Sequence, residues 1–417
     1  MTYQLWTPEH IDTTINLPAS KSISNRALII HALSGSTTLP DNLSDCDDTE
    51  VIIRALETMP ETIDIKAAGT AMRFMTAYLS VTPGEHTLTG TERMQERPIG
   101  VLVDALRHLG ADIEYVNKEG FPPLHIRGRQ LEGRSITVDG SISSQYISAL
   151  LMIGPILPNG LEMRLLGSII SRPYIDLTLC TMRDFGAEVD WTGPDTITVS
   201  AKPYQTNHYF IENDWSSASY WYEVAALHSN EENRISLQGL SDGSKQGDST
   251  ARYLFSLLGV KTIFEEASLG KPTTVHLKRQ SAPVPRMEYN FINQPDLAQT
   301  FVVTCAMMDV PFHFKGLSTL KIKETDRIEA LKTEMRKLGF VIHDVEGKEL
   351  YWDGERCEPQ NRPVINTYND HRMAMAFAPA SCIVPFLHIA HPEVVTKSYP
   401  LFWDDLRQAG FTINEMP

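Results

Sequence analysis

Two acidic residues stand beside clustered cations in the C-terminal half of the chain. Asp296 lies in NQPDLAQTF, at the entrance to an apolar helical pattern, and Glu324 lies in KETDR. A carboxylate next to Lys or Arg can take up or release a proton in a reaction, because neighbouring charges shift its pKa. Plainer roles are open as well, since Asp296 could cap a helix and Glu324 could interact with a helix dipole. The pair is the first candidate for proton transfer.

Several other side chains near these segments or elsewhere in the chain can carry positive charge. They are Arg97, Lys323, Arg327, His371, Arg372 and Lys397. Arg372 directly precedes the apolar run MAMAFAPA, where an unpaired guanidinium is costly, so it needs a bound anion or a carboxylate such as Asp370. For Arg327 the alternative is a surface pair with a Glu on the same helix, and for His371 it is a structural role.

A second group of cations lies near the N-terminus, in LPASKSISNRALIIHAL from Leu17 to Leu33. Lys21 and Arg26 stand among Ser20, Ser22, Ser24 and Asn25, just before an apolar pattern with helical spacing. The start of a helix attracts anions through its unpaired N–H groups and its dipole. The segment therefore suits phosphate or carboxylate binding, or else it is a well-capped helix with two solvated cations.

Similar clusters of small and hydroxyl residues precede four other apolar helical patterns. The segments are AAGTAMRFM, SISSQYISALLM, SRPYIDLTL and DWSSASYWYEVAAL. Gly69 offers close approach of the backbone, whereas Ser143, Ser144 and Gln145 offer side-chain donors, and this combination binds phosphate at helix starts. One capping Ser alone is explained by about 1 kcal/mol of helix stability.

These residues are positioned by a repeated pattern of a helix, a Gly and a short alternating strand. Clear copies are VDALRHLGADIEY, CTMRDFGAEVDW, YLFSLLGVKTIF, EMRKLGFVIHDV and DDLRQAGFTINE, and VIIRALETMPETIDIK is a less clear sixth. Gly suits the left-handed residue that ends a helix. Three copies lie on each side of Asp214, so the pattern predicts two mixed helix and strand domains of three units each.

Composition narrows the class of protein. The chain has 417 residues, 42% hydrophobic and 21% charged residues, and a formal net charge of -15, which disfavours nucleic-acid binding. Its five cysteines are widely spaced without a C-x-x-C pair, so we expect neither disulfides nor a metal site. The sequence shows no apolar stretch long enough for a membrane span and no export signal, and we expect a cytoplasmic protein.

The motifs together resemble the 5-enolpyruvylshikimate-3-phosphate (EPSP) synthase family along nearly the whole chain. They are LPASKSISNRALI, AGTAMR, ERPIG, SSQY, SRPYIDLTL, DWSSASY, KETDRIEAL and YNDHRMAM. The resemblance implies an α/β (α+β) enolpyruvyl transferase fold of two domains, each made of three βαβαββ units with pseudo-threefold symmetry. It also implies domains at 20–212 and at 1–19 with 213–417, an active site in the cleft between them, and a monomer.

The implied reaction transfers the enolpyruvyl group of phosphoenolpyruvate to the 5-hydroxyl of shikimate 3-phosphate through a tetrahedral intermediate, without metal or cofactor. It releases phosphate and belongs to chorismate and aromatic amino-acid biosynthesis. By resemblance, the carboxylate of shikimate 3-phosphate is held by Ser22 and Arg26. Its phosphate and ring are held by Ser143, Ser144, Gln145, Ser171 and Tyr174.

The resemblance assigns the phosphoenolpyruvate phosphate to Lys21, Gly69, Arg97 and Gln145, and its carboxylate to Arg327, Arg372 and Lys397. Asp296, assisted by Lys323, takes the proton of the 5-hydroxyl. Glu324 protonates the methylene carbon and later removes a proton, Lys21 protonates the leaving phosphate, and His371 borders the reacting groups.

The chain departs from the common family pattern N-A-G-T-A-M-R-P at two positions, Ala67 and Phe74. Loss of the Asn amide and the change from Pro to Phe predict a weakened phosphoenolpyruvate site and a changed sensitivity to the family's inhibitor glyphosate. Two rivals remain. One is the related transferase acting on UDP-N-acetylglucosamine, which carries a loop Cys that has no match here, and the other is a non-catalytic sensor with the same fold.

Overall fold

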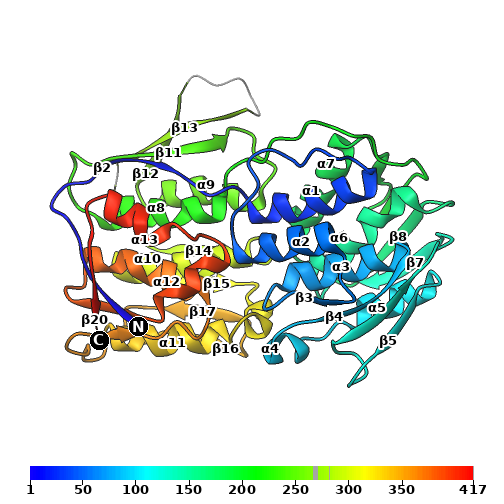
Figure 1. Cartoon of the computed structure of the whole chain (residues 1–417). Coiled ribbons are helices and arrows are strands. Elements are labelled where there is room, and N and C mark those ends of the chain that lie inside the picture. The colour runs from blue at the N-terminus through cyan, green and yellow to red at the C-terminus, as the bar shows by residue number, and fades with distance from the viewer. Residues whose placement is uncertain (266–270, 281, 417) are drawn as a thin grey trace. The chain divides into compact units, whose positions relative to one another are not determined.

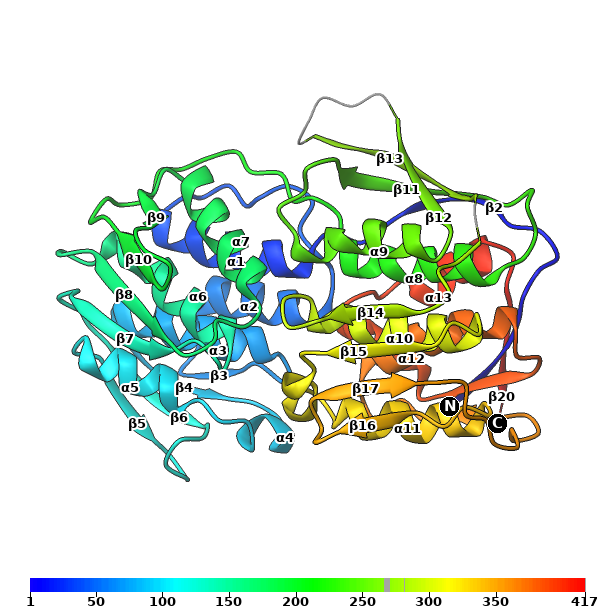
Figure 2. The same cartoon turned by 180° about the vertical axis from the view of Figure 1, so that it is seen from behind.

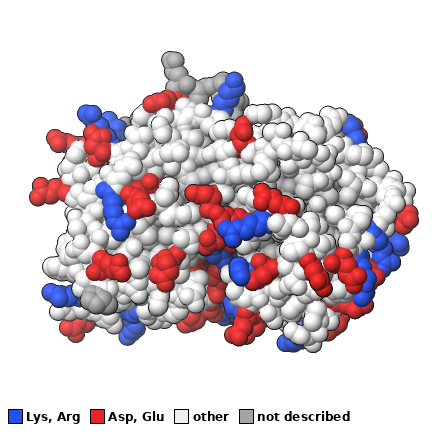
Figure 3. Space-filling view, in the orientation of Figure 1, with Lys and Arg blue, Asp and Glu red and all other residues white. Residues whose placement is uncertain are grey.

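The computed structural model describes residues 1–265, 271–280 and 282–416 of the chain (Figure 1). The chain forms two compact units: unit 1 consists of Met1–Pro18 with Glu212–Pro417, and unit 2 of Ala19–Ile211. Unit 2 is thus an insertion in the chain of unit 1. No helix within the described ranges combines the length and the apolar character needed to cross a membrane. On the face shown in Figure 3, basic and acidic side chains are interspersed.

Unit 1 contains three copies of one βαβαββ arrangement. In each, the first strand pairs parallel with the second, and the second and third strands both pair antiparallel with the fourth. The first copy has β2 (Asp12–Asn16), α8 (Trp215–Leu227), β11 (Arg234–Ser241), α9 (Ala251–Leu257), β12 (Val260–Phe264) and β13 (Pro272–Arg279). The second has β14 (Met287–Asn290), α10 (Ala298–Met307), β15 (Phe312–Lys315), α11 (Arg327–Lys337), β16 (His343–Val345) and β17 (Glu349–Trp352).

The third copy of unit 1 is completed by the beginning of the chain. It has β18 (Val364–Ile365), α12 (His371–Phe377), β19 (Leu387–Ala390), α13 (Phe402–Gln408) and β20 (Thr412–Met416), with β1 (Thr2–Trp6) as its fourth strand. Strand β1 lies between β19 and β20. The two termini of the chain therefore belong to one sheet (Figure 1).

Unit 2 contains two copies of the same arrangement. The first has β3 (Thr62–Asp64), α3 (Gly69–Val81), β4 (Gly84–Thr89), α5 (Gly100–His108), β5 (Asp112–Tyr115) and β6 (Leu124–Gly128). The second has β7 (Ser135–Asp139), α6 (Ser144–Ile153), β8 (Leu161–Leu166), α7 (Arg172–Asp184), β9 (Val189–Trp191) and β10 (Thr196–Val199). Two further helices, α1 (Lys21–Ser34) and α2 (Asp47–Thr58), precede β3, and in the segment between them Asp41 forms an isolated parallel bridge with Phe210.

Short helical turns link these elements. They are α4 (Glu92–Gln95), η1 (Gly154–Ile156), η2 (Gly247–Thr250), η3 (Pro295–Leu297), η4 (Ser318–Ile322), η5 (Ala378–Cys382) and η6 (Pro392–Lys397). Three of them, η2, η3 and η6, carry charged side chains that the site uses. The described residues therefore hold five four-stranded sheets, three in unit 1 and two in unit 2.

The predicted helix ends are present. The five glycines of the clear copies all have positive φ, between 82° and 104°: Gly110, Gly186, Gly259, Gly339 and Gly410. In the sixth copy Met59 takes the left-handed conformation instead, with φ 40°. There the following strand, β3, pairs parallel with β4 and so opens the next sheet rather than forming a third strand. This explains why that copy is the least clear in sequence.

Each unit has its own apolar core. In unit 1, helices α8 and α12 both pack against α10, every residue of which is buried (Figure 2). In unit 2, α1, α3 and α6 pack against one another. The helix starts that carry polar clusters therefore belong to buried helices, and their first turns are held rigidly.

Candidate active site

Arg327 is the centre of a charged cluster in unit 1. Its side chain is 1% exposed and makes two bonds to Asp370, from Nε to Oδ2 at 2.6 Å and from Nη2 to Oδ1 at 3.1 Å. Asp370 is fully buried at the start of α12, where it also accepts the backbone N–H of Arg372. Burial lowers the pKa of Arg327, but Asp370, Glu324 and Asp296 outweigh it and raise that pKa above its usual value. Arg327 is therefore a permanent buried cation.

Asp296 lies in η3 and is surrounded by three cations. Its carboxylate is 3.2 Å from Nη1 of Arg327, 3.1 Å from Nη2 of Arg372 and 3.4 Å from Nζ of Lys323. Burial alone would raise the pKa of Asp296, but the three cations hold it well below its usual value. Asp296 is thus ionised at neutral pH, in a form that can accept a proton.

Glu324 joins the other side of the cluster. Its carboxylate is 3.0 Å from Nη2 of Arg327 and 2.9 Å from Nζ of Lys397, which lies at the end of η6. Arg372 also receives support from α8, because its Nη1 donates to the hydroxyl of Tyr220 at 3.2 Å. The two candidate proton carriers, Asp296 and Glu324, are therefore bridged by one guanidinium, that of Arg327.

These contacts decide between the alternatives left open by the sequence. Asp296 does not cap α10, and the cap of α11 is Asp326, which accepts the N–H groups of Ile328 and Glu329. Arg327 does pair with a nearby Glu, but as a buried side chain rather than at the surface. The side chain of Arg372 pairs with Asp296. Its predicted carboxylate partner, Asp370, instead binds the side chain of Arg327.

His371 lies within the same cluster. It is 2% exposed, and its Nδ1 is 3.6 Å from Oδ1 of Asp370. The buried imidazole thus lies beside a carboxylate of the charged cluster, and its neighbours also suit a structural role.

One acid of the cluster could not be identified from the sequence. Asp248, in η2, is buried and accepts a hydrogen bond from the hydroxyl of Ser216. Burial raises its pKa to about 6; repulsion by Asp296 adds to this, whereas Arg372 opposes it. No sequence signal marked this residue, because GDST resembles an ordinary turn.

In unit 2, Lys21 stands in the first turn of α1, as predicted. Its Nζ is 3.2 Å from Oδ2 of Asp48, a buried residue in the first turn of α2. Ser20 caps the helix by accepting the N–H of Ile23. The capped helix is therefore confirmed, but its Lys is paired with a buried acid rather than solvated.

Arg26 lies deeper in unit 2, 3% exposed, and its hydrogen bonds all go to neutral groups. Nε donates to Oγ1 of Thr178 at 2.7 Å, and Nη2 donates to Oγ of Ser148 at 3.3 Å and to the carbonyl of Tyr174 at 3.2 Å. Nη1 donates to the carbonyl of Ser22 at 2.8 Å. Burial lowers the pKa of Arg26 to about 10. A buried cation held by neutral groups favours an anionic ligand.

Gly69 and Arg97 are in close contact at the start of α3. A Cβ atom on Gly69 would lie 2.7 Å from Nη1 of Arg97, so a side chain there would displace the guanidinium. Thr70, the next residue, accepts a hydrogen bond from Nε2 of Gln145 at 3.1 Å. The starts of α3 and α6 are thus linked directly, which brings three of the predicted phosphate-binding residues into one region.

The predicted serines occupy the starts of α6 and α7. Ser143 caps α6 by accepting the N–H of Gln145 at 3.2 Å, and Ser144 is buried in the first turn. Ser171 precedes α7 with φ 52°, a left-handed conformation that is unfavourable for Ser, and its side chain makes no capping bond. Backbone strain of this kind concentrates at functional sites.

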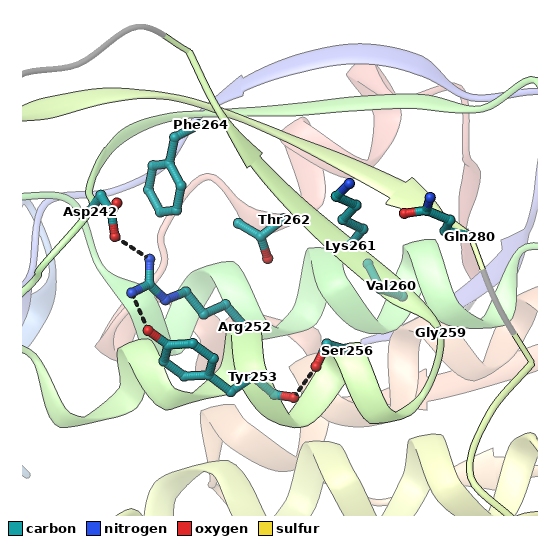
Figure 4. A pocket seen from close by; sticks show the side chains of 10 residues that line it. All are labelled: Asp242, Arg252, Tyr253, Ser256, Gly259, Val260, Lys261, Thr262, Phe264 and Gln280. Carbon is teal, nitrogen blue, oxygen red and sulfur yellow. Dashed lines mark hydrogen bonds and ion pairs between the residues drawn. The ribbon is translucent and has the colours of Figure 1, made fainter.

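A cavity of about 770 Å³ in unit 1 contains none of these residues (Figure 4). It is lined by Asp242, Arg252, Tyr253, Ser256, Gly259, Val260, Lys261, Thr262, Phe264 and Gln280. There Arg252 binds Asp242 at 2.7 Å and contacts the rings of Tyr253 and Phe264. The charged cluster, rather than this cavity, carries the groups suited to proton transfer. Within the described residues no group of side chains is arranged to hold a metal ion.

The fold is that of enolpyruvyl transferases. The EPSP synthase structure from Acinetobacter baumannii matches with a TM-score of 0.79 at 20% identity, covering 99% of this chain and 100% of that one. The enolpyruvyl transferase NikO from Streptomyces tendae matches with a TM-score of 0.73 at 16% identity, covering 100% of this chain and 98% of that one. At such identities these likenesses establish the fold alone.

The sequence comparisons define the family. The model of EPSP synthase (3-phosphoshikimate 1-carboxyvinyltransferase) matches residues 5–64 and 57–406. The 3-phosphoshikimate 1-carboxyvinyltransferase of Bacteroides fragilis is 60% identical over 413 residues, 99% of each chain, and that of Haemophilus influenzae is 35% identical over 434 aligned positions, covering 95% of this chain and 96% of the relative. The chain belongs to the EPSP synthase family and is a transferase, as the motifs predicted.

Proposed function

We propose that the charged groups of the two units together transfer the enolpyruvyl group of phosphoenolpyruvate to the 5-hydroxyl of shikimate 3-phosphate. The family gives the activity: the chain is a 3-phosphoshikimate 1-carboxyvinyltransferase. The observation that supports our assignment of residues is the cluster around Arg327, in which both candidate proton carriers contact one buried guanidinium.

In the addition step, Asp296 takes the proton of the 5-hydroxyl as that oxygen bonds to C2 of phosphoenolpyruvate, and Glu324 gives a proton to C3. The low pKa of Asp296 keeps it ionised before the step. Withdrawal of Arg372 and Lys323 toward the bound anions raises that pKa, and Asp296 becomes a better base. Arg327, Arg372 and Lys397 are then the partners of the phosphoenolpyruvate carboxylate.

In the elimination step, the bond from C2 to the phosphate oxygen breaks, Glu324 removes a proton from the new methyl group, and phosphate leaves with a proton from Lys21. In this proposal Gly69, Arg97 and Gln145 hold that phosphate. Ser22 and Arg26 hold the shikimate carboxylate, while Ser143, Ser144, Ser171 and Tyr174 hold the 3-phosphate and ring. Cations held near the developing charges stabilise both transition states.

Purified protein should release phosphate only when both substrates are present. The Asp296→Asn variant should lose about 100-fold or more of kcat, the range for loss of a general base, while still binding shikimate 3-phosphate. The matched control is Asp309→Asn, an exposed acid of the same unit paired with Arg356. Phosphate release that persists in Asp296→Asn would contradict the assigned base. Absence of release from the unaltered protein would favour the sensor.

The same proposal places the enzyme in the cytoplasm as a monomer. All five cysteines are free in the structure, which suits a reducing compartment. Light scattering of the purified protein should give a mass near 46.8 kDa.

A further inference from the structure

Phe74 stands beside the guanidinium of Arg26. Its side chain is fully buried in α3, and Cζ of Arg26 lies 5.4 Å from the centre of its ring. The contact joins α3 to α1, two helices that pack together within unit 2. At this distance the face of an aromatic ring attracts a cation.

The charge of Arg26 can be stabilised by such a ring because its hydrogen bonds include no carboxylate. It is 3% exposed, and its hydrogen bonds end on two hydroxyls and two carbonyls rather than on a carboxylate. A guanidinium has five N–H donors, and these four bonds leave one donor, on Nη1, for a ligand. The bonds hold the group in place, and its Cζ lies over the face of the Phe74 ring.

We propose that Phe74 is a positioning residue that holds Arg26 for the carboxylate of shikimate 3-phosphate. This inference rests on the proposed role of Arg26 in binding that carboxylate. It assigns Phe74 to a different substrate from the one expected from the sequence. There Phe74 follows AAGTAMR and predicts an effect on phosphoenolpyruvate binding. In the structure its ring contacts the residue assigned to the other substrate.

The consequence is a selective effect on one substrate. A ring that positions Arg26 strengthens binding of the shikimate carboxylate and leaves the contact of Gly69 with Arg97 unchanged. Loss of the ring therefore weakens binding of shikimate 3-phosphate without a matching change for phosphoenolpyruvate.

The test uses Phe74→Leu, which keeps an apolar side chain and removes the ring, with Met75→Leu as control. Met75 is equally buried in the same helix and belongs to the same core. Two probes are titrated into each variant: shikimate 3-phosphate and its carboxylate methyl ester. We expect Phe74→Leu to raise the Kd of the acid by about 3- to 30-fold, the range of a desolvated cation–π contact. The Kd of the ester, the KM of phosphoenolpyruvate and all values for Met75→Leu should stay within about two-fold.

Equal losses for acid and ester, or an equal rise in the KM of phosphoenolpyruvate, would overturn the inference. Phe74→Met is measured in parallel, so that a folding defect of one variant, visible by circular dichroism, does not decide the result. Arg26→Lys distinguishes a failure of the role proposed for Arg26 from a failure of the inference about Phe74. If it leaves the preference for the acid over the ester intact, the role proposed for Arg26 fails. If it removes that preference and neither Phe74 variant changes it, only the inference about Phe74 fails.

Discussion

The two units hold their buried cations in opposite ways. In unit 1, Arg327 and Arg372 bind carboxylates: Asp370, Glu324 and Asp296. In unit 2, Arg26 is as deeply buried, but its bonds go to hydroxyls and carbonyls. One region balances its charges internally, whereas the other leaves a cation supported by neutral groups.

The difference indicates where an anion gains most free energy on binding. A ligand that reaches Arg26 supplies a negative charge that the surroundings lack, so its binding displaces no internal carboxylate. A ligand that reaches Arg372 or Lys397 competes with Asp296 or Glu324 for them. Under the proposed function, binding to unit 1 would therefore rearrange the carboxylates of Asp296 and Glu324, and binding to unit 2 would leave its scaffold in place.

Removal of one acceptor from each region tests this difference in charge balance most directly. Asp370→Asn leaves Arg327 without its closest buried carboxylate and should reduce the free energy of unfolding by about 3 kcal/mol or more. Thr178→Val removes a neutral acceptor from Arg26 and should cost about 1 to 3 kcal/mol. Hydrogen exchange read by mass spectrometry assigns each loss to its unit, and tryptophan fluorescence follows unit 1, which holds five of the six tryptophans. Equal costs would mean that the charge balance does not distinguish the regions.

A smaller loss should follow from crowding the cation at the start of α3. In Gly69→Ala the new methyl group would lie 2.7 Å from Nη1 of Arg97, so the guanidinium must shift. We expect the KM of phosphoenolpyruvate to rise about ten-fold, as for loss of one charged hydrogen bond. Gly100→Ala, where the nearest atom would be 3.5 Å away, is the control and should behave like the unaltered protein. A normal KM in Gly69→Ala would remove Arg97 from the phosphate site.

Lys21 of unit 2, unlike Arg26, binds an acid. Asp48→Asn removes this ion pair, and ordering the flexible Lys21 side chain on substrate should then lower kcat/KM for phosphoenolpyruvate about five-fold. Asp47→Asn changes the neighbouring exposed acid and serves as the control. An increase in kcat/KM would show instead that Asp48 competes with the phosphate.

The smallest expected effect is a pH dependence in unit 1. The pKa of Asp248 is raised from 3.8 to about 6, so the folded protein binds this proton more tightly than the unfolded chain does. Its contribution to stability is therefore full below pH 4 and is lost as the pH rises from 4 to 6. Urea unfolding of Asp248→Asn should show a weaker decline across this range than the unaltered protein. Glu231→Gln changes an exposed acid of unit 1 and is the control, so it should decline like the unaltered protein. A decline in Asp248→Asn equal to that of the unaltered protein would mean that Arg372 keeps Asp248 ionised.

The starts and ends of helices were predictable because their signals are local. The Gly positions after α5, α7, α9, α11 and α13 and the serine clusters before α1, α6 and α7 lie within a few residues of the backbone groups that they satisfy. The motifs also identified the family. Roles assigned to individual site residues stay predictions until variants are measured.

The partners of the buried charges were not predictable, since they depend on packing between distant elements. Arg327 binds a carboxylate 43 positions away, and the acid that binds Lys21 is 27 positions away. The contact of Phe74 with Arg26 likewise requires α1 and α3 to pack side by side. Asp248 lies in a turn whose sequence gives no sign of burial.

The position of β1 has a consequence for protein synthesis. This strand pairs with β19 and β20, whose last paired residue is Met416, so β1 is synthesised long before its partner strands. At 5 to 20 residues per second, that wait is roughly 20 to 80 s. The inserted unit, residues 19–211, is complete much earlier and can fold while unit 1 is still being made. During that interval β1 has no partner strand and is available to chaperones.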